Sequence, residues 1–245
     1  MTSGGGWYER WFGEQYLQLY PHRDATEAGD AVRLALDSCP IPADGRILDL
    51  ACGGGRHLNE FMRGGALVFG LDLSLPLLTH ARAIGARVVR GDMRRLPFDG
   101  GSFSLVTSFF TSFGYFPSAA EDREVLVEVR RILEPGGMFV FDFLNADRVR
   151  ANLLPRDERV VDGQRVVQTR TLTEEGHVVE KKIEILGPTD PLPHVFYERV
   201  RLYSAGDLQA ILESCGLQVV QWFGSYAGEP LDSDSPRVIL IGRAV

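Results

Sequence analysis

Apolar positions along residues 1–150 follow two patterns that alternate. Short runs that are apolar throughout are typical of buried strands, and the stretches between them repeat apolar residues at helical spacing. The runs predict strands over 47–50, 66–71, 86–90, 102–110 and 138–143. Helical spacing places these residues on buried faces: Ala28, Val32, Ala35 and Leu36; Leu58, Phe61 and Met62; Leu77, Leu78 and Ala81; and Val125, Leu126, Val129, Ile132 and Leu133 within a helix over 121–133. This alternation predicts an α/β fold with a parallel sheet that helices cover on both faces.

Beyond about residue 152 the pattern changes to segments that are β-branched and polar. The turn sequences Asp162-Gly163 and Glu174-Glu175-Gly176 are typical of hairpins. Strands are predicted over 159–167, 169–173, 178–185 and 196–203. We therefore expect an antiparallel β insertion that is solvated on one face.

The last part of the chain returns to helix and strand. Ser204 and Asp207 resemble a capping box for a helix through Ser214, and Gly216 is placed to end that helix. Asp24 and Ser74 are the predicted N-caps of two earlier helices. Closing strands are predicted over 217–223 and 237–241.

The segment 7–20 is unusually aromatic. Trp11, Tyr16, Leu17 and Tyr20 can share one face of a helix or of two short turns. Two interpretations stay open: a helix that docks on the core, or a lid over a planar ligand. Aromatic side chains with polar tips suit such half-buried sites.

We interpret the whole chain as one domain, 1–245. Its predicted sections are an N-terminal helical lid over 1–45, a ligand-binding core over 46–150, the antiparallel insertion over 151–203, and the last helix with the closing strands over 204–245.

Composition is that of an ordinary globular protein and argues against several function classes. Of the 245 residues, 44% are hydrophobic and 24% charged, and the net charge is −7. An acidic chain lacks the basic surface on which sequence-independent nucleic-acid binding depends. The start of the chain does not resemble a signal peptide, and no apolar run approaches the ~18 residues of a membrane span. We expect a cytoplasmic protein that binds neither nucleic acid nor membrane.

The three cysteines, Cys39, Cys52 and Cys215, are odd in number and lack CxxC spacing. This favours reduced thiols over a disulfide framework or a zinc site. Cys52 precedes three glycines, where it is either a reactive thiol or a small residue tolerated beside a ligand.

Gly53-Gly54-Gly55 connect the first predicted strand to a helix. Glycine permits positive φ and lets a ligand approach the main chain, and the N–H groups that open the next helix point to the same place. A dinucleotide loop has a further glycine at the position that Leu58 occupies here. We therefore interpret the three glycines as a cofactor loop that binds no pyrophosphate. A nicotinamide-dependent oxidoreductase stays an alternative that Leu58 opposes.

Two acids follow the next two predicted strands. Asp72 can accept hydrogen bonds from both hydroxyls of a ribose, and Asp92 can hold an exocyclic amino group while Met93 packs on a ring. Either acid could instead cap a turn.

Four segments carry a family resemblance. In order they are 48–55 (LDLACGGG), 70–74 (GLDLS), 91–98 (GDMRRLPF) and 133–137 (LEPGG), and together they resemble the motifs of class I S-adenosylmethionine-dependent methyltransferases. The resemblance implies a Rossmann-like seven-stranded sheet whose last strand is antiparallel. It also implies S-adenosyl-L-methionine as cofactor and S-adenosyl-L-homocysteine as product.

The resemblance assigns residues to parts of that cofactor. Those expected to bind it are Asp49, Ala51, Cys52, Gly53 and Gly55 (methionine part), Asp72 with the adjacent Leu73 (ribose), Asp92 and Met93 (adenine), and Ser108 and Phe109 (near the sulfonium). Arg56 is a candidate for the methionine carboxylate because its guanidinium is a fork-shaped cation, or else it is a surface arginine.

The run 111–116 and the β insertion resemble members of the family that act on small molecules, such as sugar N-methyltransferases and glycine or sarcosine methyltransferases. We therefore expect in-line methyl transfer to an N or O atom of a small-molecule partner. A protein that keeps the cofactor pocket without catalysis is the second alternative, and a homodimer is left open.

An in-line displacement needs positioning more than covalent chemistry, and a base only where the acceptor is protonated. The candidate catalytic residues are Tyr16, Tyr115 and His194, with Tyr20 and His22 as further pocket candidates. Each has packing or the surface as its alternative. Asp142 and Asn145 are only two of the several oxygen ligands that a hard cation needs, so no metal is expected.

Overall fold

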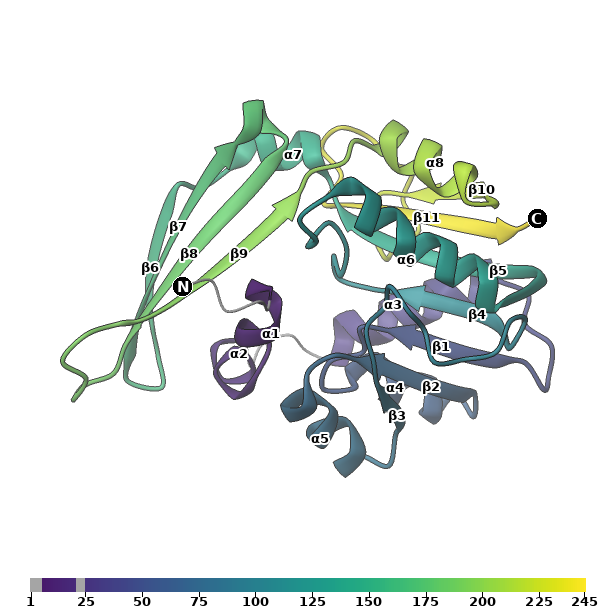
Figure 1. Ribbon diagram of the computed structural model, residues 1–245, viewed down its shortest axis with the longest axis horizontal. Coiled ribbons are helices and arrows are strands. Elements are labelled where there is room, and N and C mark those ends of the chain that lie inside the picture. Colours follow the sequence, from purple (N-terminus) through teal and green to yellow (C-terminus); the bar gives the residue numbers. More distant parts are fainter. Residues whose placement is uncertain (1–5, 21–24) are drawn as a thin grey trace.

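The structure is a computed structural model that describes residues 6–20 and 25–245. It contains a seven-stranded and a four-stranded sheet, with the short helices α1 (Trp7–Trp11) and α2 (Glu14–Leu19) between them (Figure 1). The α/β fold with an antiparallel insertion is confirmed. The predicted cap Asp24 and the candidate His22 lie outside the described residues.

The larger sheet has the strand order β10-β11-β5-β4-β1-β2-β3. Its strands are β1 (Arg46–Leu50), β2 (Leu67–Asp72), β3 (Arg87–Arg90), β4 (Phe103–Ser108), β5 (Leu133–Leu144), β10 (Leu217–Phe223) and β11 (Arg237–Ala244). As expected, the last strand, β11, runs antiparallel to both of its neighbours. The chain leaves β1 toward β2 on one side and later returns to β4 on the other. Ligands of such sheets bind at the carboxyl ends of the strands beside this reversal.

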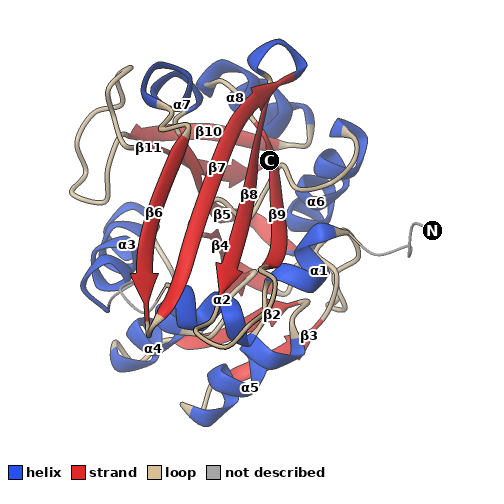
Figure 2. Ribbon diagram, turned by 90° about the vertical axis from the view of Figure 1, so that its left-hand side faces the viewer, coloured by secondary structure: helices blue, strands red, loops and turns tan. Residues whose placement is uncertain are grey.

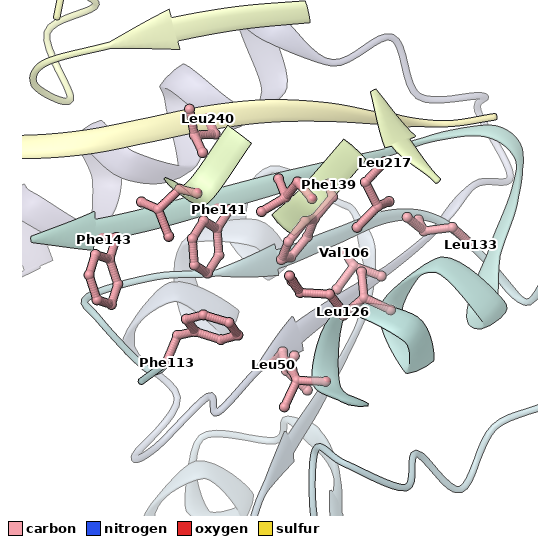
Figure 3. Packing of buried hydrophobic residues seen from close by; sticks show 14 of the residues in the cluster. Leu50, Val106, Phe113, Leu126, Leu133, Phe139, Phe141, Phe143, Leu217 and Leu240 are labelled. Carbon is pink, nitrogen blue, oxygen red and sulfur yellow. The ribbon is translucent and has the colours of Figure 1, made fainter. Parts of the chain in front are cut away.

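Helices cover both faces because successive strand residues point to opposite sides. Ile47 and its equivalents face α3 (Ala25–Ser38), α4 (Arg56–Arg63) and α5 (Leu75–Ala83). Leu48 and its equivalents face α6 (Ala119–Ile132) and α8 (Ala205–Ser214). Figure 3 shows this second layer, in which three phenylalanines of β5 line up with Phe113 below them. The alternation predicted from the apolar pattern is therefore realised in two packed layers.

The insertion is a four-stranded antiparallel sheet that lies in front of the larger sheet in Figure 2. Its elements are β6 (Arg156–Val161), β7 (Gln164–Thr173), the single turn η1 (Glu174–Gly176), β8 (Val178–Leu186) and β9 (His194–Arg201). Both hairpin turns are confirmed; Asp162 and Gly163 have φ of 49° and 78°, the pair of positive values that a two-residue hairpin turn requires. The predicted break at Gln168 is wrong, because Gln168 pairs in register with both neighbouring strands and is buried.

The N-terminal helices pack on the insertion. Trp11 and Leu19 form a buried cluster with Val166, Ile183 and Ile185 from β7 and β8. The aromatic segment thus forms two short helices, and its docking surface is the inner face of the small sheet.

Some boundaries differ from the predicted ones. Helix α6 begins at Ala119, two residues early, because Ser118 and Glu121 form a capping box. Strand β5 begins at Leu133 because this residue already pairs with Phe103, and the turn that follows bulges out before Met138 resumes the ladder. Helix α7 (Ala146–Asn152) was not predicted. The predicted caps Ser74 and Ser204 with Asp207 are confirmed.

Within the described part of the chain, no helix combines the length and the apolar character that a bilayer crossing would need.

Candidate active site

A cavity of about 1010 Å³ opens where the carboxyl ends of β1, β2, β3 and β4 meet the N-terminal helices and β9. One end of it is lined by the glycine loop and the residues after β2 and β3. The other end is lined by aromatic side chains of α1, α2 and the segment after β4. We call these the loop end and the aromatic end. The volume lies at the top of the ~300–1,000 Å³ range of small-molecule sites, so two ligands can share the cavity.

The glycine loop bends where the backbone adopts positive φ. Ala51, Gly53 and Gly55 have φ of 57°, 54° and 87°. A Cβ at Gly55 would lie 3.0 Å from Ala81 Cβ, so this glycine is needed for conformation and for space. Leu58 occupies the position at which a dinucleotide loop has a further glycine. It is fully buried beside Phe61, so its side chain contributes to core packing.

Asp72 is the last residue of β2, and its side chain is hydrogen-bonded to the glycine loop. Its two carboxylate oxygens accept hydrogen bonds from the backbone N–H groups of Gly53 and Ser74, each at 2.8 Å. Burial raises the pKa of Asp72, and these backbone donors offset part of the rise. The residue is 9% exposed and lines the cavity, as does Leu73. A carboxylate has about four acceptor positions, so Asp72 can still accept hydrogen bonds from a ligand.

Asp92 and Met93 also line the loop end. Burial works to raise the pKa of Asp92, but the guanidinium and backbone N–H of Arg94 outweigh it and hold that pKa below its ordinary value. The Arg94 guanidinium lies 2.6 Å from one Asp92 oxygen, pairs with Glu121 at 2.7 Å and covers the Phe116 ring at 4.4 Å. Sequence reasoning missed this arginine, which orients the acid.

Asp49 and His57 lie just behind the wall of the loop end. Asp49 is 1% exposed; one oxygen accepts a hydrogen bond from Thr107 Oγ1 at 3.0 Å, and Oδ2 has no hydrogen-bond partner among the described residues. Burial raises the pKa of Asp49 to about 7. Burial and two nearby arginines lower the pKa of His57, whose Nδ1 lies 3.9 Å from Asp49 Oδ2. His57 reaches the cavity wall and Asp49 does not.

The other predicted cofactor residues are divided between wall and core. Ala51, Cys52, Gly53, Gly55, Arg56 and Phe109 line the cavity, whereas Ser108 is buried and is not part of the wall. Arg56 pairs with Glu27 at 2.9 Å and lies over the Phe110 ring at 4.5 Å. Burial raises the pKa of the Cys52 thiol, which makes a reactive thiolate there unfavourable. None of the three cysteines forms a disulfide.

Four rings surround the aromatic end. The Tyr115 ring centroid lies 4.9 Å from that of Trp7 and 5.9 Å from that of Phe12, which in turn lies 4.9 Å from Tyr16. These rings come from segments more than ninety positions apart in the chain, so no local pattern could group them.

Two carboxylates on the elements of this end line the cavity, Glu9 of α1 and Glu198 of β9, and Glu198 has oriented partners. It accepts hydrogen bonds from Trp11 Nε1 at 2.6 Å and from Lys181 Nζ at 3.0 Å. Tyr20 joins the group by accepting a bond from Lys181 at 2.7 Å. Sequence reasoning missed Glu198, although it is the charged residue between Phe196 and Val200 on alternating positions of a strand.

Of the three candidate catalytic residues, two line the cavity and one does not. Tyr16 and Tyr115 line the cavity, as does Tyr20. His194 is not part of the wall; it is exposed at the start of β9, 3.7 Å from Asp190.

No group of three or more potential metal ligands occurs within residues 6–20 and 25–245. Asp142 is buried against Arg237, and Asn145 caps α7 with its side-chain oxygen. Both residues thus have structural partners.

Comparison with known proteins agrees with this geometry. Residues 47–137 match the family model described as a methyltransferase domain. A dTDP-3-amino-3,4,6-trideoxy-alpha-D-glucopyranose N,N-dimethyltransferase of Streptomyces venezuelae is 29% identical over 223 residues, which cover 84% of this chain and 89% of the relative. A cypemycin N-terminal methyltransferase of Streptomyces is 29% identical over 238 residues, covering 94% and 96%. The solved structure of the CcbJ methyltransferase from Streptomyces caelestis superposes with a TM-score of 0.80 at 20% identity, covering 96% and 98%, and supports the fold alone.

Proposed function

Because the chain belongs to the class I S-adenosylmethionine-dependent methyltransferases and transfers methyl groups to small molecules, we propose that its acceptor is an aliphatic amine. Of the two relatives described above, one is named as an N,N-dimethyltransferase of an amino sugar and the other as an N-terminal methyltransferase. Both cover more than four fifths of this chain. The chemistry that we infer from both names is methylation at an amine nitrogen.

The residues of the loop end fit the cofactor. The bare backbone of the glycine loop leaves room for close approach, Asp72 keeps acceptor positions toward the cavity, and Asp49 Oδ2 is a buried acceptor whose bond is unmade. When bound, S-adenosylmethionine supplies a methyl group on a sulfonium that is already an activated leaving group. The expected roles are Asp72 and Leu73 at the ribose, Asp92 and Met93 at the adenine, and Arg56 with Asp49 at the amino-acid part.

The aromatic end suits an amine. Trp7, Phe12, Tyr16 and Tyr115 present ring faces and edges to a group that becomes cationic as it is methylated, and such faces attract cations. Glu198 adds one carboxylate, already oriented by Trp11 and Lys181, that can accept a hydrogen bond from an ammonium group. The rings hold the nitrogen in line with the methyl group while they exclude water.

Tyr16 and Tyr115 remain the candidate catalytic tyrosines of this proposal. An acceptor that arrives as an ammonium needs only to lose a proton, which Glu198 or water can accept, while the tyrosine hydroxyls can accept hydrogen bonds that orient the nitrogen. His194 lies outside the cavity wall and has no role in this proposal. Action in the cytoplasm, without nucleic acid or membrane, and assembly as a homodimer stay predictions.

The observation that carries the proposal is the Glu198 carboxylate, oriented by Trp11 and Lys181, in the same cavity as the rings of the aromatic end and the cofactor loop. The test is incubation with methyl-labelled S-adenosylmethionine and three acceptors: a nucleotide-linked amino sugar, its hydroxyl counterpart, and a short peptide with an unblocked N-terminus. We expect mono- and dimethylated product from at least one amine and none from the hydroxyl sugar. Equal methylation of the hydroxyl sugar, or turnover of that sugar alone, would exclude an amine-specific site.

A further inference from the structure

Two consecutive residues directly after β4 have a backbone that their side chains disfavour. Phe110 and Thr111 both have φ of 63°, in the left-handed region that glycine prefers, and Thr111 is β-branched. Both line the cavity. The other positive-φ residues with side chains, among those described, are Ala51 in the glycine loop and Asp162, Glu174 and Glu175 in hairpin turns. Strained backbone persists only where surrounding structure over-determines it, and it gathers at functional sites.

A buried ion pair holds this turn. Asp142 of β5 is fully buried; its Oδ2 accepts a hydrogen bond from Phe110 N at 2.6 Å, and its backbone oxygen accepts one from Thr111 N at 3.2 Å. Arg237 of β11 forms two bonds to the Asp142 carboxylate and donates from Nη2 to Thr111 Oγ1 at 3.0 Å. Tyr226 donates its hydroxyl to the same carboxylate.

Stability alone is a weak reason for such a pair. Desolvating two charges offsets much of their attraction, so the pair between the buried Asp142 and the 16% exposed Arg237 contributes little to stability by itself. The conformation that the pair specifies is a further reason for it. The side-chain hydrogen bonds of Asp142 and Arg237 described above connect these two residues to each other, to Tyr226 and to the turn at residues 110–111.

The turn joins the two ends of the cavity. The guanidinium groups of Arg56 and Arg237 lie over the Phe110 ring at 4.5 Å and 5.0 Å. Tyr115 donates its hydroxyl to the backbone oxygen of Thr111. Phe110 thus contacts a residue of the cofactor loop region, and Thr111 fixes a ring of the aromatic end.

We propose that Asp142 and Arg237 are positioning residues that clamp Phe110 and Thr111 in the left-handed conformation, and thereby set Tyr115 relative to the cofactor loop. The link to methyl transfer rests on the proposed function; the clamp itself does not. Because the clamp acts on geometry between the two ligands, its loss should lower kcat and leave cofactor affinity nearly unchanged.

The test compares substitutions at Thr111 that differ in one hydroxyl. Thr111→Val keeps the β-branched shape and removes the acceptor of the Arg237 bond, whereas Thr111→Ser keeps that acceptor. We expect kcat for the amine to fall about tenfold or more in Thr111→Val, with the KM for S-adenosylmethionine within about twofold, and Thr111→Ser to rescue most of the loss. Arg237→Lys keeps the charge but lacks the planar fork whose Nε and Nη2 bond Asp142 and Thr111 together, and it should reproduce the Thr111→Val effect. Thr79→Val, at an exposed hydroxyl on α5 outside the cavity wall, is the control.

Hydrogen exchange of the peptide 109–116 gives a readout that needs no turnover. We expect faster amide exchange there in Thr111→Val and Arg237→Lys than in the wild type and in Thr111→Ser, with S-adenosylhomocysteine affinity preserved. Loosening of this peptide in a protein that methylates no amine would support the clamp and contradict the proposed function. Unchanged exchange and kcat in both variants of an enzyme that does methylate amines would overturn the clamp. A lower melting temperature with unchanged kcat would make the pair merely structural and would also overturn it.

Discussion

The loop end and the aromatic end of the cavity are built from different parts of the polypeptide. At the loop end the ligand meets backbone: a glycine bend, and acids whose carboxylates are fixed by neighbouring N–H groups or by Arg94. At the aromatic end it meets side chains from α1, α2, the segment after β4 and β9. The first kind of site is set by a few local residues at strand ends. The second depends on how distant segments pack, so it can change its ligand without disturbing the first.

The sharpest test of this contrast is at Asp72. Asp72→Ala removes a cavity carboxylate together with the acceptor of the Gly53 and Ser74 bonds. We expect S-adenosylhomocysteine to bind ~100-fold more weakly or worse, because several hydrogen bonds to a charged group are lost together. Calorimetric titration measures this, with Asp99→Ala at an exposed turn as the matched control. Wild-type affinity in Asp72→Ala would refute the ribose assignment.

The corresponding change at the aromatic end is Glu198→Gln. We expect kcat/KM for the amine to fall ~10–100-fold, since a charge-assisted hydrogen bond to the acceptor is lost. Cofactor affinity should stay within about twofold, because distant sites act independently. Glu184→Gln serves as the control. It removes the negative charge of an ion pair with Lys182, and neither residue of that pair lines the cavity. If Glu198→Gln weakened S-adenosylhomocysteine binding as strongly as it weakened catalysis, the two ends could not be treated as separate.

A smaller effect concerns pH and Asp49 beneath the loop end. An acid whose pKa is raised on folding holds its proton more tightly in the folded state, so its contribution to stability falls as pH rises between the ordinary value of 3.8 and about 7. Asp49→Asn removes this dependence. Its melting temperature relative to the wild type should therefore rise with pH across that window.

The same residue offers a check with ligand. A cationic amino group bound at the wall in front of Asp49 favours the ionised carboxylate, so S-adenosylhomocysteine binding near pH 7 should release protons from Asp49. Calorimetry in buffers of different ionisation enthalpy detects this release. Proton release that persists unchanged in Asp49→Asn would mean that another group is responsible.

Local signals were enough to predict the sheet, the glycine loop and Asp72. Each depends on neighbours within a few positions: a run of apolar residues, a bend that only glycine fits, an acid at a strand end. The same holds for the hairpin at Asp162 and the cap at Ser204. Two errors arose where a distant partner decides. Leu133 joined β5 because of Phe103, and Gln168 stayed in β7 because strands on both sides pair with it.

The aromatic end could not be assembled from the sequence for the same reason. Glu198 is significant because Trp11 and Lys181 orient it, and neither is near it in the chain. From the sequence, Asp142 is one of two oxygen ligands that are too few for a metal, because its actual partner, Arg237, lies ninety-five positions later. The imidazole of His194 could act as a base, but the residue is exposed at the start of β9, outside the cavity wall.

The burial of Trp11 and Leu19 against β7 and β8 has a consequence for engineering acceptor preference. In a chimaera that received only residues 156–201 from a relative, the apolar face of the new sheet would pack against α1 and α2, whose side chains fit the original sheet. Segments 6–20 and 156–201 therefore form one exchangeable module, and a successful transplant has to move both together.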